Sequence, residues 1–238
     1  MTRIGGIIFA RMNSKRLPGK AMVDISGKTL LERVIERTKK IKNIEHFCIA
    51  TSINKEDDEI ASFAIRNQIS LYRGSLNNVI SRAAEAATRY KYDSFLRICG
   101  DRPFFDIDIY DEMLTIHKLE KHELTTNIFP RTVPPGLTGE IIDLKSLRRV
   151  LNLTTDKLDM EHLTRYYYNN SEKFKIFNCN FYNEKETLEL RLVVDDENDL
   201  DRARWISSNL NEDVNFSLYQ KKIISLAKDW QILNLRNQ

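Results

Sequence analysis

Short apolar runs alternate with amphipathic segments along the first 120 or so residues of the chain. The apolar runs predict buried strands over 4–9, 47–52, 69–72 and 94–99. After each run, apolar residues recur every three or four positions, which predicts helices that begin near residues 30, 54, 79 and 107. Four strand–helix repeats are typical of a parallel sheet with helices on both faces, an α/β fold.

The pattern changes after Leu124, where prolines and glycines indicate a loop-rich crossing over residues 128–140. The remaining periodicity predicts strands over 140–144, 174–181 and 188–194, and helices near 145–153, 159–170, 200–210 and 214–226. The sequence contains no repeat and no linker that would separate two units. We therefore expect one domain over residues 1–238, with a small lobe of about residues 125–180 inserted over the sheet.

Residues suited to ligand binding follow each of the first four predicted strands. A basic loop over residues 11–20 follows the first strand, and Thr51-Ser52, Arg73-Gly74-Ser75 and Gly100-Asp101 follow the next three. The carboxyl ends of parallel strands meet at one edge of a sheet, where open α/β folds bind their ligands, so these groups should share one rim. The alternative for the basic loop is a solvated surface segment.

Amino-acid composition indicates the cellular compartment of the protein but says little about its chemistry. A net charge of +3 is too small to indicate binding to nucleic acid or to a membrane. Cys48, Cys99 and Cys179 are scattered and lie in apolar contexts, which predicts buried thiols in a reducing compartment. Because no apolar run approaches the length of a membrane span or a signal segment, we expect a cytoplasmic protein.

Two aspartates add a possible metal site to this rim. Asp101 follows the fourth predicted strand, and Asp195 follows the predicted strand over 188–194. One or two carboxylates beside a basic loop suit Mg²⁺ bound together with a nucleoside triphosphate. The alternative for each aspartate is a strand-end turn or a helix cap. The chain has no P-loop sequence and no G-x-G-x-x-G, so neither of those nucleotide-binding motifs applies.

The loop Ala10-Arg11-Met12-x-Ser14-x-Arg16-Leu17-Pro18-Gly19-Lys20 resembles the signature loop of the cytidylyltransferase family, most closely its spore-coat-polysaccharide branch. Further matching segments follow in order: Ala50-Thr51-Ser52, Tyr72-Arg73-Gly74-Ser75, Arg97-Ile98-x-Gly100-Asp101-x-Pro103, Pro135-Gly136-Leu137, Glu161-His162-x-Thr164 and Leu192-Val193-Val194-Asp195. The resemblance extends over nearly the whole chain, to about residue 210.

This resemblance implies a Rossmann-like nucleotidyltransferase fold and a homodimer formed through the segment of about residues 125–180. It also implies transfer of CMP from CTP to a sugar or sugar acid, with Mg²⁺ as cofactor. The implied nucleotide-binding residues are Arg11, Ser14, Arg16, Lys20, Thr51, Arg73, Ser75 and Gly100, with Arg82 as a weaker candidate. Lys20, Arg16 and Asp101 would be catalytic, Asp101 and Asp195 would bind the metal, and Glu140, Glu161 and His162 would face the acceptor.

The chain departs from the family pattern at several positions. Asn77-Asn78 stand where the branch usually has acidic residues, and Arg102 follows the first metal aspartate in place of a small or uncharged residue. Gly136-Leu137-Thr138-Gly139-Glu140 and Asp195-Asp196 also differ from the usual motifs. These departures spare the implied metal ligands and indicate an altered acceptor pocket.

Three functional hypotheses follow. The first is a Mg²⁺-dependent cytidylyltransferase that makes a precursor of surface polysaccharide and releases pyrophosphate. The second is a glycosyltransferase with a nucleotide-sugar donor, which the many cations of the loop disfavour. The third is a catalytically silent nucleotide-binding protein, which Asn77-Asn78 and Arg102 keep open.

Overall fold

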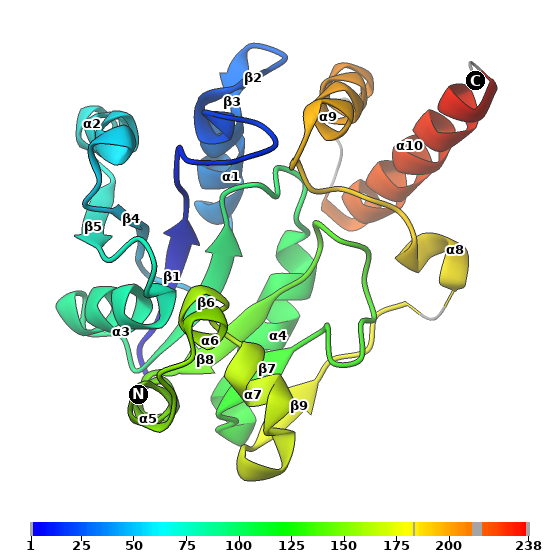
Figure 1. Cartoon of the computed structure of the whole chain (residues 1–238). Helices are drawn as coiled ribbons and strands as arrows, with labels where there is room; N and C mark the ends of the chain where they lie inside the picture. The colour runs from blue at the N-terminus through cyan, green and yellow to red at the C-terminus, as the bar shows by residue number, and fades with distance from the viewer. Residues whose placement is uncertain (1, 183, 211–215, 237–238) are drawn as a thin grey trace.

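The computed structural model describes residues 2–182, 184–210 and 216–236, which form a central sheet surrounded by helices (Figure 1). The sheet has seven strands in the order β5-β4-β1-β6-β8-β7-β9. In chain order the strands are β1 (Ile4–Phe9), β4 (Phe47–Ser52), β5 (Ser70–Gly74), β6 (Ser94–Cys99), β7 (Leu124–Thr126), β8 (Glu140–Asp143) and β9 (Ile176–Asn178). A separate two-stranded hairpin consists of β2 (Asp24–Ile25) and β3 (Lys28–Thr29).

The four strands predicted for the first half are confirmed, and they pair in parallel. β1 lies between β4 and β6, and β5 pairs with the outer side of β4. Three of the four have the predicted bounds, while β5 begins one residue later than predicted and extends to Gly74. The arrowheads of β1 and β6 point to the same side of the molecule (Figure 1), so their carboxyl ends form one edge.

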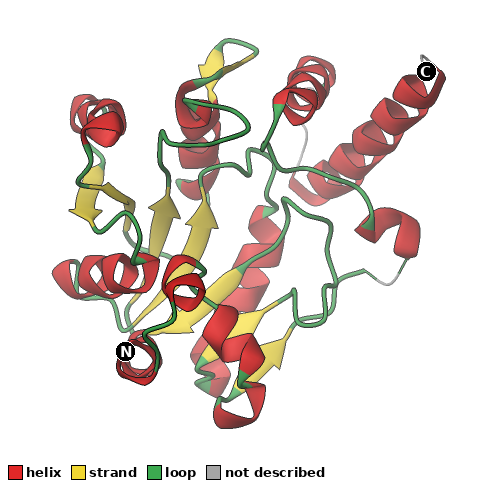
Figure 2. Ribbon diagram, in the orientation of Figure 1, coloured by secondary structure: helices red, strands yellow, loops and turns green. Residues whose placement is uncertain are grey.

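The helices cover both faces of the sheet, as expected (Figure 2). They are α1 (Leu30–Thr38), α2 (Asp58–Arg66), α3 (Val79–Arg89), α4 (Ile107–Glu120), α5 (Leu144–Leu153), α6 (Lys157–Glu161), α7 (Arg165–Asn169), α8 (Lys185–Leu188), α9 (Glu197–Asn209) and α10 (Phe216–Arg236). Short 3₁₀ helices, η1 (Lys20–Met22), η2 (Lys55–Asp57) and η3 (Ser171–Lys173), complete the elements. Among the described helices, none is long and apolar enough to cross a lipid bilayer.

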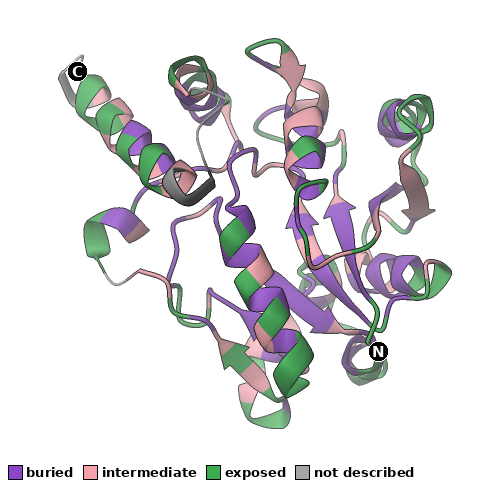
Figure 3. Cartoon of the chain, turned by 180° about the vertical axis from the view of Figure 1, so that it is seen from behind, coloured by how far each residue is buried: buried purple, intermediate pink, exposed green. Residues whose placement is uncertain are grey.

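Figure 3 shows that the central strands are largely buried, and their alternating side chains build two cores. Ile8 of β1 packs in one core with α1, α2, α4, α9 and α10, whereas its neighbour Ile7 packs in the other with α3, α5 and α7. Successive residues of a strand point to opposite faces, and this alternation explains why the central strands are apolar throughout. The packed helices on both faces therefore fix the position of the strands and of their carboxyl ends.

The segment of about residues 125–180 extends the main sheet. β8 pairs antiparallel with β6, β7 pairs antiparallel with β8, and β9 pairs in parallel with β7. β7 has only three residues and was not predicted. The predicted strand over 174–181 is reduced to β9, and the predicted helix over 159–170 is divided into α6 and α7 because the chain is extended at His162 (φ −105°, ψ 91°).

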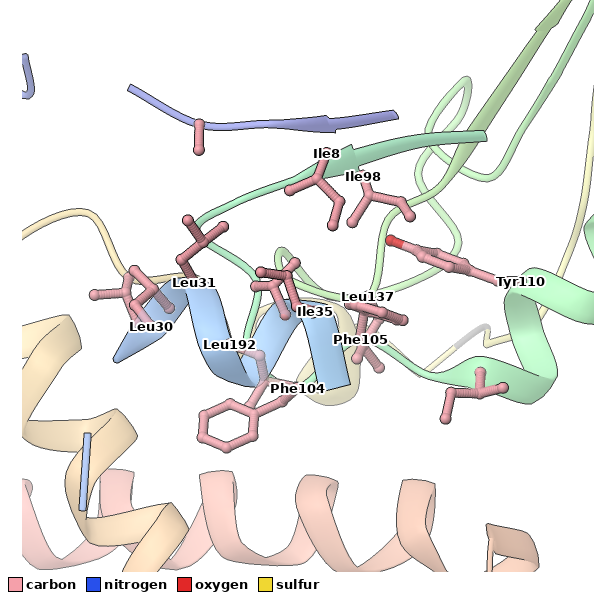
Figure 4. Packing of buried hydrophobic residues seen from close by; sticks show 14 of the residues in the cluster. Ile8, Leu30, Leu31, Ile35, Ile98, Phe104, Phe105, Tyr110, Leu137 and Leu192 are labelled. Carbon is pink, nitrogen blue, oxygen red and sulfur yellow. The ribbon is translucent and has the colours of Figure 1, made fainter. Parts of the chain in front are cut away.

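The predicted strand over 188–194 is wrong. Leu188 ends α8, and residues 190–195 run outside any sheet. The apolar alternation that suggested a strand is real, because Leu190, Leu192 and Val194 are all buried. Figure 4 shows Leu192 within the core cluster, and its N–H donates to the Pro135 carbonyl at 2.7 Å. Single backbone bonds to loops thus replace the ladder that a strand would need.

Two further expectations need comment. Cys48 and Cys179 are buried as predicted, but Cys99 is only partly buried because it lines a cavity at the end of β6. The last predicted helix began at residue 214, and residues 214 and 215 lie outside the described chain. The described helix, α10, runs from Phe216 to Arg236.

Candidate active site

Lys20 joins the two aspartates at the carboxyl edge of the sheet. Gly19 adopts the left-handed conformation (φ +70°) directly before η1, a backbone turn that glycine makes without steric cost. The Lys20 Nζ atom lies 3.0 Å from Asp101 Oδ2 and 2.9 Å from Asp195 Oδ1. A third contact, 3.4 Å from Nζ to the Val194 carbonyl oxygen, completes its environment. Carboxylates 94 positions apart in the sequence (195 − 101) thus converge on one cation.

Asp195 is the most heavily paired carboxylate of this site. Its Oδ2 atom lies 3.1 Å from an Arg16 guanidinium nitrogen and 2.9 Å from Arg191 Nη2. Burial alone would raise the pKa of the Asp195 carboxyl, but Lys20, Arg16 and Arg191 together hold that pKa below its usual value. Burial likewise opposes the charge of Lys20, yet the two aspartates raise the pKa of its ammonium group. The Asp195 carboxylate and the Lys20 ammonium group are therefore charged at neutral pH.

The buried carboxylate of Asp199 fixes the position of Asp195. Only 2% of Asp199 is exposed, and its carboxylate accepts hydrogen bonds from Arg191, Arg202 and the Asp195 backbone N–H. Asp196 caps α9 by accepting from the Asp199 N–H at 2.9 Å. The segment after residue 190 is consequently positioned by α9 rather than by a strand.

Gly100 allows the loops after β1 and β6 to lie against each other. A side-chain Cβ at this position would be 3.0 Å from both the Ala10 Cβ and the Phe9 carbonyl oxygen. The Gly100 N–H also donates to that carbonyl at 2.9 Å. A larger residue would push the two loops apart and would move Asp101 relative to Lys20.

Two adjoining cavities occupy this edge. The first, about 260 Å³, is lined by Phe9, Ala10, Arg11, Lys20, Ala21, Val79, Arg82, Arg97, Cys99, Gly100, Asp101, Glu161, His162 and Asp195. The second, about 420 Å³, is lined by Arg11, Asn13, Ser14, Lys15, Arg16, Lys20, Leu76, Asn77, Glu161 and Asp195. Together they place every cation of the basic loop beside both aspartates, as the shared-rim hypothesis required. Four loop cations around one space suit a triphosphate.

Most of the predicted site residues line these cavities, but four do not. Arg11, Ser14, Arg16, Lys20, Gly100, Asp101, Glu161, His162 and Asp195 line one or both cavities, while Thr51, Arg73, Ser75 and Glu140 are not among the lining residues. Arg11 and Glu161 face each other at 3.6 Å across the entrance, and both side chains are 45% exposed. The break between α6 and α7 accounts for the approach of Glu161 and His162.

Of the four remaining residues, Arg73, Ser75 and Glu140 form polar contacts within the fold, and Thr51 is buried. Arg73 donates from Nε to the Ser52 carbonyl at 2.9 Å and pairs with Asp58. Ser75 Oγ accepts from the Asn78 N–H at 3.0 Å, and Thr51 is fully buried. Their roles in nucleotide binding stay predictions.

Glu140 and Arg102 also form internal contacts. Only 1% of Glu140 is exposed, and it pairs with Arg97 at 2.5 Å. Arg102 donates to the Thr138 carbonyl, to which the Tyr110 hydroxyl also donates at 2.8 Å. Arg102 is absent from the lining of the two cavities, so its departure from the family pattern changes an internal contact.

Arg82 and Arg97 add two further cations to the lining of the first cavity. Arg82 is 4% exposed, lines the first cavity and donates to the carbonyls of Ser75 and Leu76. Burial, with the nearby charge of Arg11, lowers the pKa of the Arg82 guanidinium to about 10. From the sequence, Arg82 was only a weaker candidate for nucleotide binding, implied by the family resemblance. For Arg97, the signal was a single arginine inside an apolar strand.

Asp57 anchors the basic loop to β4. Its carboxylate accepts from the Met12 N–H at 2.7 Å, from the Ser52 N–H at 3.0 Å and from the Ser52 hydroxyl at 2.5 Å. Only 1% of Asp57 is exposed. Burial would raise the pKa of this carboxyl, but the three donors hold the pKa below its usual value of 3.8.

We expect Asp57→Asn to lower the free energy of unfolding by about 1–3 kcal/mol, because the new amide group would face buried donors. Urea unfolding at neutral pH measures this loss. Since the folded-state pKa is depressed, the contribution is present above the unfolded pKa and is lost as pH falls through the folded value. Wild type and variant should therefore converge below about pH 4. Asp58→Asn is the matched control, since its side chain is 56% exposed and its pair with Arg73 should contribute less than about 1 kcal/mol.

Asp101 and Asp195 are suitable ligands for a divalent cation. One oxygen of each already points to a common positive group, the Lys20 ammonium. Mg²⁺ commonly takes one or two carboxylates and completes its octahedron with phosphate oxygens and water. Within the described chain, no cluster of three or more His, Cys, Asp or Glu residues would hold a metal by itself. The residues thus fit a metal that binds together with a polyphosphate.

Comparison with known proteins agrees with this geometry. Residues 6–226 match the family model described as Cytidylyltransferase. A solved cytidylyltransferase from Leptospira borgpetersenii superposes with a TM-score of 0.87 and is 32% identical, covering 98% of this chain and 97% of that one. The fold is therefore that of the α/β nucleotidyltransferases.

Two curated proteins extend the comparison. The spore coat polysaccharide biosynthesis protein SpsF of Bacillus subtilis is 25% identical over 211 residues, which cover 87% of each chain. The 3-deoxy-manno-octulosonate cytidylyltransferase of Geobacter metallireducens is 32% identical over 115 residues, or 47% of this chain and 43% of that protein. Since the family model covers nearly the whole chain and its signature loop meets both aspartates at one cavity, the chain belongs to the cytidylyltransferase family of nucleotidyltransferases.

Proposed function

We propose that the protein transfers CMP from CTP to a hydroxyl group of a sugar or sugar acid and releases pyrophosphate, with Mg²⁺ at Asp101 and Asp195. The observation that carries this proposal is the convergence of the loop cations and both aspartates on two adjoining cavities. The names of two relatives, a spore coat polysaccharide protein and a sugar-acid cytidylyltransferase, support a role in making a surface polysaccharide precursor.

In this reaction the acceptor oxygen bonds to the α-phosphorus of CTP as the bond from that phosphorus to the β-phosphate oxygen breaks. Pyrophosphate leaves, the hydroxyl proton passes to water, and no enzyme nucleophile is needed. Lys20 and Arg16 offset the charge that develops on pyrophosphate, and Arg11 and Ser14 orient the phosphate chain. When bound, Mg²⁺ supplies further neutralisation of the phosphate oxygens. Glu161 and His162 line the first cavity and would face the acceptor.

Two measurements separate this reaction from the alternatives. We expect calorimetry to show that CTP with Mg²⁺ binds at least about tenfold more tightly than CDP- or UDP-sugars, because the loop cations match a triphosphate. Incubation with CTP and a panel of sugars and sugar acids should release pyrophosphate with at least one acceptor. Tighter binding of nucleotide sugars would favour the glycosyltransferase, and tight CTP binding without turnover would favour the silent protein.

The homodimer through residues of about 125–180 stays a prediction. That region has several exposed apolar side chains, Phe129, Leu153, Leu158 and Phe177. β9 is also the edge strand of the sheet, with one side open to pairing. These features support an interface there, and the mass of the protein in solution tests it.

A further inference from the structure

Arg97 lines both the first cavity of the candidate site and a third cavity. The third cavity, about 310 Å³, is lined by Arg97, His162, Thr164, Arg165, Tyr168 and Asn169. Arg97 and His162 line the first cavity as well, so the two cavities adjoin at these side chains. Asp101 follows four residues after Arg97, beyond the end of the same strand, β6. The third cavity therefore extends from the reacting end of the nucleotide site, where an acceptor must lie.

The lining of the third cavity favours a negatively charged occupant. Of the six described residues that line it, two are arginines and none is acidic. Both arginines are partly neutralised, because Arg165 pairs with Asp156 and Asp159 on the α6 side and Arg97 pairs with Glu140. Arg97 has 25% of its side chain exposed, and a guanidinium group keeps its charge at every physiological pH. Its fork of donors suits an anionic group with two oxygens.

A buried hydrogen-bond network positions the Arg97 guanidinium group. Arg97 Nη1 donates to Glu140 Oε2, and the Tyr168 hydroxyl donates to Glu140 Oε1 at 2.6 Å. Because the Tyr168 proton is used in that bond, the Thr126 hydroxyl donates to Tyr168, at 2.9 Å. The Phe129 ring stacks on Tyr168 with centroids 4.8 Å apart. Both oxygens of Glu140 are thus occupied by the protein, and Glu140 orients Arg97 instead of offering a free oxygen to a ligand.

We propose that Arg97 binds an anionic group of the acceptor and thereby determines acceptor specificity, with Glu140 and Tyr168 as positioning residues. This inference rests on the proposed CMP transfer. The acceptor then carries a carboxylate or a phosphate close to the hydroxyl that attacks the α-phosphorus. The positive end of the third cavity selects such a molecule over the neutral sugar of the same size.

The test uses the whole protein with CTP, Mg²⁺ and three groups of acceptors: 2-keto-3-deoxy sugar acids, sugar monophosphates and neutral sugars. Pyrophosphate release should occur in an anionic group, and the reacting group identifies carboxylate or phosphate. For that acceptor, Arg97→Met should raise KM about 30- to 100-fold while kcat changes far less, because a charge-assisted contact is lost. The affinity for CTP, measured by calorimetry, should change less than about threefold.

Three comparisons separate binding of the anion from loss of structure. The wild type should prefer a reactive sugar acid to its uncharged C1 amide, or a reactive sugar phosphate to its methyl ester, and Arg97→Met should lose most of that preference. Tyr168→Phe, which keeps the guanidinium and removes one donor to Glu140, should raise the acceptor KM about threefold to tenfold. Arg148→Met changes an exposed arginine that bonds to Thr88, remote from the cavities, and should behave as wild type.

The possible failures are distinct. If only neutral sugars react, CMP transfer stands and the assignment of Arg97 is wrong. The same conclusion follows if Arg97→Met and Tyr168→Phe leave the acceptor KM and the charge preference unchanged. If CTP binds but none of the three groups yields pyrophosphate, the proposed function is wrong and the role of Arg97 falls with it.

Discussion

Asp101→Asn should reduce the rate of pyrophosphate release by about 10²- to 10³-fold, equivalent to about 3–4 kcal/mol. The substitution keeps the shape of the side chain but removes one of the two charges that face Lys20. The Asp101 side chain is 25% exposed, so the fold should tolerate an amide there. Steady-state assays with the acceptor found in the panel, at several Mg²⁺ concentrations, measure the effect.

The matched control is Asp108→Asn, because Asp108 is an exposed residue in the first turn of α4. Its rate should stay within about twofold of wild type, since the lost helix-dipole interaction is small. Thermal unfolding of both variants should be close to that of wild type. Near-normal activity in Asp101→Asn would exclude this aspartate from the metal site and leave Asp195 without a partner.

Lys20→Met should have two opposite effects, which together identify the role of the lysine. The kcat/KM for CTP should fall about 10²- to 10³-fold, because the ammonium group no longer stabilises the leaving pyrophosphate. In the absence of nucleotide, however, the affinity for Mn²⁺ should rise by at least about tenfold, since a unit charge next to both carboxylates is removed. Calorimetry or the electron paramagnetic resonance signal of free Mn²⁺ measures this affinity without any turnover.

Lys28→Met provides the comparison for Lys20→Met, because Lys28 pairs with Glu36 on the hairpin side of α1. In that control, the kcat/KM for CTP and the affinity for Mn²⁺ should both stay at their wild-type values. An unchanged or weaker affinity for Mn²⁺ in Lys20→Met would mean that the two aspartates do not serve as a joint metal site. A normal kcat/KM would remove Lys20 from the reaction.

The sequence was most informative where burial is complete. β1, β4 and β6 lie inside the sheet with helices on both faces, so each is an unbroken apolar run with clear ends. β7 is too short for such a signal, and its antiparallel place between β8 and β9 depends on contacts distant in the sequence. Residues 190–195 show the opposite case, because alternating burial arises there without any strand partner.

The candidate site likewise has parts that the sequence predicted and parts that it did not. The basic loop and both aspartates could be predicted because each group follows an apolar run and matches a family motif. The side-chain partners could not be predicted from spacing: Arg73 bonds to the loop after β4, and Glu140 bonds to Arg97. The sequence analysis assigned no role to Arg97, because one charged residue in a buried strand has no periodic signature. The two cavities that Arg97 lines also include residues of the α6–α7 segment, which is distant in the sequence.

Asp195 reaches the site on a segment that belongs to no strand. The last strand of the main sheet ends at Asn178, before the second aspartate in the sequence. During synthesis, which proceeds from the N-terminus, the scaffold can be complete before that carboxylate leaves the ribosome. Docking of residues 190–195, through backbone bonds such as that from the Val194 N–H to the Asp101 carbonyl at 2.9 Å, is then the step that assembles the site. Under the proposed function, the site for Mg²⁺ is therefore complete only after this late tertiary contact has formed.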